Sequence, residues 1–144
     1  WPAARERLAT RTRSLGLPAD VAAHLAFFYG RDANVVLEIA AEDARLGERI
    51  LPDLPYLKAE VIFAVRHTMA QQLEDVLARR TRISIEDGAR GTGVATAVAR
   101  LMAGELGWPP EQVCAEVAAY AAAVERHLAA EGLALTEPTP ELGA

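Results

Sequence analysis

Apolar residues recur along this chain at the three- and four-residue spacing of helix faces, most densely between Tyr56 and Arg82. The first half of this stretch is apolar on most sides, which is typical of a helix buried among other elements. The second half keeps a narrow apolar stripe, with acids before it and arginines after it, as the helix dipole favours. We expect the fold to be organised around the first helix, whose main face comprises Val61, Ala64, Val65, Thr68 and Met69.

Three shorter helices are predicted before this stretch. The first covers residues 5–14, and the second covers residues 18–30 with Phe28 in its apolar stripe. Asp32 is the expected N-cap of the third helix, which runs to about Arg45. Two short helices joined by a Gly-Arg turn also resemble a helix-turn-helix, but an ordinary helical hairpin is favoured because the chain is acidic.

Glycines interrupt the chain after the central stretch. Before them, residues 82–88 are predicted to add one or two helical turns, with Ile83 and Ile85 buried. The order Gly-x-x-Gly-x-Gly is not the dinucleotide-binding fingerprint, and no predicted strand precedes it. A phosphate at the next helix N-terminus is physically possible, but a plain helix break is favoured. The three glycines are Gly88, Gly91 and Gly93.

Two longer helices are predicted in the last third of the chain. The first starts at Thr92 or Gly93 and ends before Gly107, and a Pro-Pro pair opens the second, which Gly132 ends. Thr, Pro and Glu dominate after it, which is typical of disorder. The sequence therefore predicts an all-α fold: one bundle of about six to seven helices over residues 1–135 and a disordered tail over residues 136–144.

The bulk composition narrows the class of protein. Apolar residues make up 51% and charged residues 24% of the 144 residues, which is typical of a globular domain. A net charge of −5 argues against nucleic-acid binding, because phosphate contact usually requires a basic face. Cys114 is the single cysteine, which fits a reducing compartment. No apolar run approaches the ~20 residues that span a bilayer, and no signal peptide is present, so a cytoplasmic location is expected.

No catalytic or metal-binding residue is assigned from local patterns. The three histidines lie on different predicted helices, and no carboxylate or cysteine stands at metal-ligand spacing. Arg66 and His67 interrupt the most buried segment, where Arg66 could hold a ligand anion. The favoured interpretation is a core arginine paired with Glu60, or with Glu74 and Asp75.

The clearest charged feature is a basic cluster, Arg79, Arg80 and Arg82, beside Thr81. Such a cluster on an acidic chain could bind a phosphate, an anionic lipid head group or an acidic patch on another domain. The alternative is that these are solvated charges at a helix C-terminus. The sequence leaves both interpretations open.

The central stretch resembles the C-terminal helical domain of FAD-dependent, aerobic-type glycerol-3-phosphate dehydrogenases. The most specific part is the Arg-Arg-Thr-Arg run that follows Glu-Asp-Val-Leu, and the resemblance extends over residues 4–133. Gln72 stands where the family often has threonine, which removes a good N-cap. The matching positions are Tyr56, Ala59-Glu60-Val61, Ala64-Val65-Arg66-His67, Glu74-Asp75 and Arg79-Arg80-Thr81-Arg82.

The resemblance implies a reaction for a longer parent enzyme. Members of the family oxidise sn-glycerol 3-phosphate to dihydroxyacetone phosphate, passing a hydride to FAD. The flavin and substrate residues belong to an N-terminal domain, so no catalytic residue carries over to this chain. By resemblance this segment is a non-catalytic cap that binds no FAD itself. Its candidate interdomain or anion contacts are Arg66, His67, Arg79, Arg80 and Arg82.

The resemblance also implies partners and a location. The expected partner is the flavin domain, and the parent is expected to lie peripherally on the inner face of the cytoplasmic membrane. An isolated domain would expose apolar surface, through which a homodimer could form. Because the chain starts at Trp1 and not at methionine, we expect either a removed leader or a piece of a longer protein. A free-standing helical interaction module is the alternative function.

Overall fold

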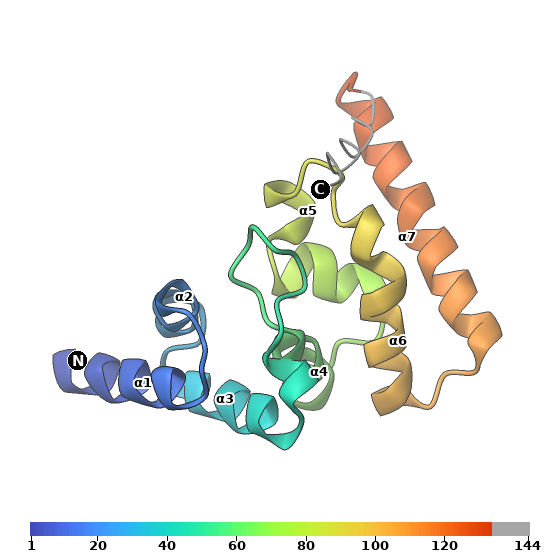
Figure 1. The fold of residues 1–144 in the computed structure, drawn as a ribbon. Coiled ribbons are helices and arrows are strands. Elements are labelled where there is room, and N and C mark those ends of the chain that lie inside the picture. The colour runs from blue at the N-terminus through green and yellow to red at the C-terminus, as the bar shows by residue number, and fades with distance from the viewer. Residues whose placement is uncertain (134–144) are drawn as a thin grey trace, which may run out of the picture. The chain divides into compact units, whose positions relative to one another are not determined.

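The structure, a computed structural model, describes residues 1–133, and every regular element in them is helical except for one isolated bridge (Figure 1). The all-α fold class is therefore confirmed for these residues, whereas the predicted disordered tail over 136–144 lies outside them. The elements are α1 (Pro2–Ser14), α2 (Ala19–Tyr29), η1 (Gly30–Asp32), α3 (Ala33–Glu42), η2 (Ala44–Gly47), α4 (Lys58–Thr68), η3 (Asp75–Arg80), α5 (Ile83–Glu86), η4 (Thr92–Val94), α6 (Ala95–Leu106) and α7 (Pro110–Ala130).

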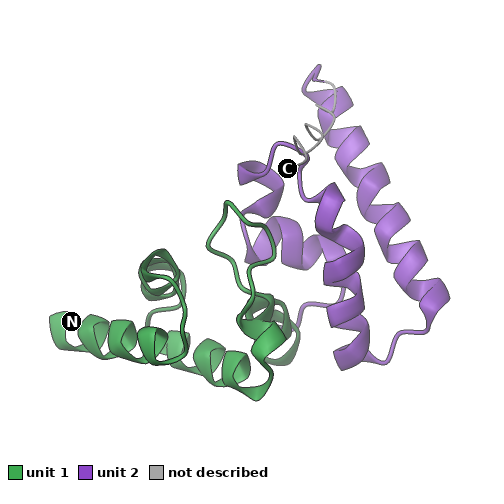
Figure 2. Ribbon diagram, viewed as in Figure 1, with its two compact units in different colours: residues 1–68 green, residues 69–144 purple. Residues whose placement is uncertain are grey.

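The chain divides into two compact units where the sequence suggested one bundle: unit 1, residues 1–68, and unit 2, which begins at Met69 (Figure 2). The boundary lies at the end of α4. Met69 has a φ of 58°, in the left-handed region that non-glycine residues rarely occupy. Its side chain is 81% exposed. The predicted place of Met69 in the buried stripe is therefore wrong, because the helix stops at Thr68.

Unit 1 contains two packed helix pairs, α1 with α2 and α3 with α4. The second helix lies between Pro18 and Gly30, as predicted. The third ends at Glu42 and not at about Arg45, and Asp32 makes no side-chain capping bond. Asp32 already has helical dihedral angles, whereas an N-cap residue normally has extended ones. The buried apolar residues of this unit include Val21, Leu25, Val36, Leu37, Leu57 and Val61.

Unit 2 packs α6 against α7 and ties α7 to the segments before it. A carboxylate oxygen of Glu116 accepts the backbone N–H of Leu73 at 3.0 Å. The hydroxyl of Tyr120 donates to the backbone carbonyl of Arg90. These two bonds fix the position of α7 in its own unit. Its buried apolar residues include Leu73, Val76, Leu77, Ile83, Met102, Val124 and Leu128.

The short helix α5 shows why one sequence prediction was wrong. Ile83 is fully buried, but Ile85 is 67% exposed. Residues two apart on a helix do not share a face. Both isoleucines therefore cannot pack into the same core from a single helical turn.

Gly91 occupies a tight point between α5 and η4. Its φ is +79°, and a Cβ added there would lie 3.1 Å from Cγ2 of Ile83 and 3.5 Å from Cδ2 of Leu77. Both the backbone conformation and the close packing therefore favour glycine. The predicted glycine break is confirmed, and both the left-handed backbone and the buried contact at Gly91 account for it.

We expect Gly91→Ala to lower the free energy of unfolding of unit 2 by about 2–5 kcal/mol. The left-handed conformation costs an L-residue about 1–2 kcal/mol, and overpacking adds about 1–3 kcal/mol. Gly93→Ala is the matched control, because a Cβ there meets nothing within 4 Å. We expect it to change stability by less than about 1 kcal/mol. Equal denaturation midpoints for the two variants would contradict this account.

Candidate functional site

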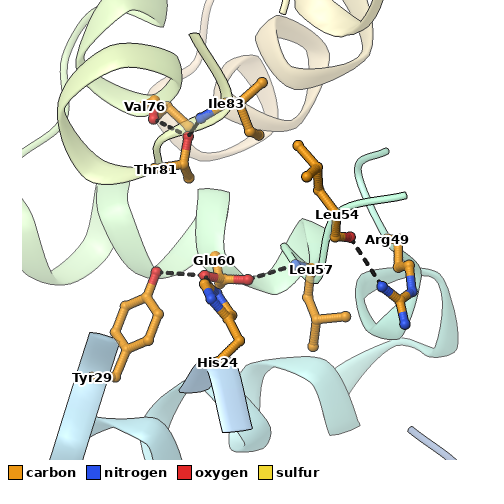
Figure 3. Close-up of polar contacts among 9 residues, drawn as sticks. All are labelled: His24, Tyr29, Arg49, Leu54, Leu57, Glu60, Val76, Thr81 and Ile83. Atoms are coloured by element: carbon orange, nitrogen blue, oxygen red, sulfur yellow. Dashed lines mark hydrogen bonds and ion pairs between the residues drawn. The ribbon is translucent and has the colours of Figure 1, made fainter. Parts of the chain in front are cut away.

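The carboxylate of Glu60 is the buried polar centre of unit 1 (Figure 3). Nε2 of His24 lies 2.7 Å from one carboxylate oxygen, and the hydroxyl of Tyr29 donates to the same oxygen at 2.8 Å. The other oxygen accepts the backbone N–H of Leu57. The side chain of Glu60 is 0% exposed and that of His24 is 4% exposed. One carboxylate therefore joins α2, α4 and the loop before α4.

Burial of a charged carboxylate is costly unless donors surround it. The three donors satisfy Glu60, and Leu57 supplies one of them as the residue that precedes α4. Glu60 is the third residue of that helix and so bonds the helix's own N-terminus, as in a capping box. Burial raises the pKa of Tyr29 well above its ordinary value, and the charge of Glu60 and the hydrogen bond raise it further. Tyr29 therefore stays protonated and donates a hydrogen bond to Glu60.

Arg66 lies away from this centre. Its guanidinium pairs with Glu42 at 3.0 Å, and its side chain is 36% exposed. His67 is also exposed, and its ring stacks on Phe63 with centroids 5.0 Å apart. The predicted burial of this pair and the predicted partners of Arg66 are wrong. The last turn of α4 faces solvent, and the partner of Arg66 comes from α3.

A second helix starts with the same kind of carboxylate contact. The carboxylate of Asp75 accepts the backbone N–H groups of Gln71 and Gln72, each at 3.0 Å, and pairs with Arg79 at 2.7 Å. Partial burial acts to raise the pKa of Asp75, but these hydrogen bonds and the charge of Arg79 outweigh it and lower the pKa. Asp75 thereby bonds the N–H of Gln72, the position where the family often has a threonine cap.

The basic cluster Arg79, Arg80 and Arg82 surrounds a buried threonine. Thr81 is 2% exposed, and its hydroxyl donates to the carbonyl of Val76 at 2.8 Å (Figure 3). The three arginines are exposed. Arg79 pairs with Asp75, and Nε of Arg82 lies 3.7 Å from Glu86. The five candidate residues are thus divided between the two units, two in unit 1 and three in unit 2.

An exposed aromatic pair at the end of α2 was missed from the sequence. Phe27 is 83% exposed and Phe28 is 42% exposed, with ring centroids 5.3 Å apart. The prediction placed Phe28 in the buried stripe. Consecutive residues point about 100° apart on a helix, so a Phe-Phe pair that ends an amphipathic helix indicates that one ring is exposed.

The N-terminal half of α7 leaves an apolar groove beside α6. The groove has a volume of about 580 Å³. Cys114 is exposed, and Val113 and Val117 are only partly buried. This part of unit 2 therefore presents apolar surface outside its core. The lining residues include Ala103, Trp108, Val113, Cys114, Val117 and Ala121.

The described residues contain no group of three or more His, Cys, Asp or Glu side chains arranged to hold a metal ion. The glycine turn lies between two helical elements, not after a strand. Among residues 1–133, no helix combines the length and the hydropathy needed to cross a bilayer.

Residues 1–113 match the family model of the C-terminal domain of alpha-glycerophosphate oxidase. The chain belongs to this family. The match covers α1 to α6 and only the first residues of α7, so most of α7 lies beyond it. The family resemblance found in the sequence is confirmed.

Curated relatives of this C-terminal domain are named as glycerol-3-phosphate dehydrogenases. That of Mycobacterium leprae is 44% identical over 115 residues, which cover 80% of this chain and 19% of the relative. That of Synechocystis is 35% identical over 97 residues, which cover 67% of this chain and 18% of the relative. A probable mitochondrial glycerol-3-phosphate dehydrogenase of Dictyostelium discoideum is 34% identical over 100 residues, which cover 69% of this chain and 16% of the relative. The chain thus spans about a fifth of the length of these relatives.

We expect Glu60→Ala to destabilise unit 1 of this C-terminal domain by about 3–5 kcal/mol, because it leaves three buried donors without an acceptor. Glu38→Ala is the control, since its carboxylate is 64% exposed and lies 3.7 Å from Arg11. That change should stay within about 0.5 kcal/mol. Urea denaturation followed by circular dichroism measures both, and a small effect at Glu60 would count against its central role.

The hydrogen bonds of Asp75 predict a stability that depends on pH. A depressed folded-state pKa stabilises the fold above the ordinary aspartate value of 3.8, and this contribution disappears as the pH falls through the lower folded-state value. At pH 6, Asp75→Asn should therefore lower stability by about 1 kcal/mol. Below the folded-state pKa of Asp75, the free energies of unfolding of the variant and the wild type should become equal. Asp53→Asn, in the exposed loop before α4, is the control and should change stability by less than about 0.5 kcal/mol. A difference for Asp75 that grew in acid would refute the assignment.

Proposed function

We propose that this chain serves as the C-terminal domain of an FAD-dependent glycerol-3-phosphate dehydrogenase. The parent enzyme would oxidise sn-glycerol 3-phosphate to dihydroxyacetone phosphate, with FAD accepting the hydride. The observation that carries the proposal is the family match over residues 1–113, together with relatives that bear this enzyme's name.

The residues of this chain do not suit a flavin site of the dinucleotide-binding type. That site needs a strand, a glycine-rich turn and a helix, and the described residues contain no such unit. Their charged and polar groups are used mainly in helix capping and in ion pairs within each unit. We therefore assign this chain a structural and docking role, and we place the chemistry in the remaining four-fifths of the parent.

The exposed aromatic pair on α2 is the docking surface that we favour. Phe27 and Phe28 lie within the part of the chain that matches the family. Exposed aromatic side chains that a partner can bury are typical of binding hot spots. The basic cluster Arg79, Arg80 and Arg82 is the second proposed contact, and Arg66 with His67 is the third.

Complementation tests the proposal directly. The glycerol-3-phosphate dehydrogenase 2 of Mycobacterium tuberculosis, 43% identical to this chain over 115 residues, would be shortened by its C-terminal fifth and co-expressed with this chain. We expect the chain to restore flavin retention and dye-linked oxidation of glycerol 3-phosphate. Failure to associate, with both parts folded, would favour the free-standing interaction module instead.

Phe27→Asp should weaken this association by at least about tenfold, because a charge would replace an anchoring ring. The isolated chain should keep its stability, since Phe27 is 83% exposed. Leu133→Asp is the matched control, at a residue that is 55% exposed and lies beyond the family match. Association measured by pull-down or calorimetry should be unchanged for the control. Equal effects of the two changes would remove the aromatic pair from the interface.

A further inference from the structure

Unit 2 contains a small, partly open cavity of about 60 Å³ between η3, α5, the turn at Arg90 and α7, with the exposed His127 at its edge. A site needs roughly 10–15 Å³ of such volume to hold one water molecule. The cavity therefore has room for a small polar group and the carbon attached to it. Its lining residues are Glu74, Ala78, Ser84, Arg90, Tyr120, Ala123, Val124 and His127.

Two of the polar residues in this lining already have partners. The hydroxyl of Tyr120 donates to the carbonyl of Arg90, and the guanidinium of Arg90 bonds Glu131 at 3.1 Å. Three others differ. Within residues 1–133, the side chains of Glu74, Ser84 and His127 form no hydrogen bond or ion pair with another residue.

Two acids, Glu74 and Asp87, and one base, Arg90, act on the Tyr120 hydroxyl in this cavity. Burial is the main cause that raises the pKa of Tyr120 to about 12, and the charges of Glu74 and Asp87 raise it further, while Arg90 acts in the opposite direction. The charge of Arg90 is itself offset by Glu131. A cation is therefore favoured in the cavity over an anion.

The remaining wall is apolar. Ala78, Ala123 and Val124 contribute methyl groups to the lining. A ligand with a short hydrocarbon stem and a charged end would match such a wall. A primary ammonium group carries three N–H donors and no acceptor. Its three donors match the three acceptor side chains Glu74, Ser84 and His127.

We infer that this cavity binds a primary alkylammonium group. The carboxylate of Glu74 accepts a charge-assisted hydrogen bond from it, and the hydroxyl of Ser84 and a ring nitrogen of His127 accept the other two. The ammonium belongs either to a free small amine or to a lysine side chain of another protein segment. Tyr120 and His127 lie beyond the family match over 1–113, so the inference does not rest on the proposed function.

An NMR titration of the intact chain with n-butylammonium chloride tests the inference. We would work at pH 8, where a primary alkylamine still carries its positive charge. Saturable shifts are expected at the backbone amides of Ser84, Ala123 and His127. 1-Butanol and sodium butyrate, the neutral and anionic counterparts, should produce no such shifts. Equal binding of butanol, or the absence of saturation with butylammonium, would overturn the inference.

Glu74→Gln should weaken butylammonium binding by at least tenfold, because it removes the charged acceptor. Glu125→Gln removes the same charge from an exposed position on α7 outside the cavity and should leave binding unchanged. Ser84→Ala, which deletes only one hydroxyl, should weaken binding several-fold and serves if Glu74→Gln does not fold. Unaltered affinity in folded Glu74→Gln would refute the assignment.

A blocked Gly-Lys-Gly tripeptide separates the two sources of the ammonium. Tighter binding of the peptide than of butylammonium would indicate a lysine side chain of a partner. Equal binding would indicate a free amine. Both results support the cavity as an ammonium site, whereas binding of neither would reject it. None of these outcomes depends on whether the chain complements the shortened dehydrogenase.

Discussion

Unit 1 depends on one buried carboxylate. Glu60 is the third residue of α4, and it bonds both the start of its own helix and two side chains of α2. Because its charge is fully removed from water, every donor around it matters more than an exposed one would. The carboxylate that caps the N-terminus of α4 therefore also holds α2 against α4. Local capping and tertiary packing are a single interaction in this unit.

Unit 2 begins with a weaker version of the same arrangement. Asp75 bonds two backbone N–H groups just before its helix, but its side chain is 17% exposed and its other partner is Arg79. The carboxylate of Asp75 thus organises one helix start without reaching another helix. In this unit the long-range polar contacts come from α7, through Glu116 and Tyr120. The two units use acids at helix starts but differ in what joins their helices.

The sequence predicted helices well because prolines, glycines and apolar spacing act locally. The limits of α2 and the long helix after Pro110 follow from such signals. Apolar spacing does not tell where a helix stops or which of two adjacent apolar residues is buried, so Met69, Ile85 and Phe28 were misplaced.

Polar partners were harder to predict than helices. The acceptor of His24 is Glu60, 36 residues away in the chain. Arg66 bonds Glu42, 24 residues earlier, although closer acids in the sequence were expected. Such pairs depend on how helices pack, and one sequence without that packing offers many equivalent acids. The sequence could indicate which charged residues were candidates, but it could not predict the partner of each one.

The proposed docking contacts and the proposed ammonium cavity differ in their relation to the family match. Phe27 and the arginine cluster lie within residues 1–113, which the family shares, whereas the ammonium cavity requires Tyr120 and His127. A chain that lost most of α7 would keep Phe27, which lies in unit 1, and would lose the ammonium cavity, together with the bond from Glu116 to the N–H of Leu73. Docking onto a flavin domain and recognition of an ammonium group are therefore separable properties, because they use different helices and different charges.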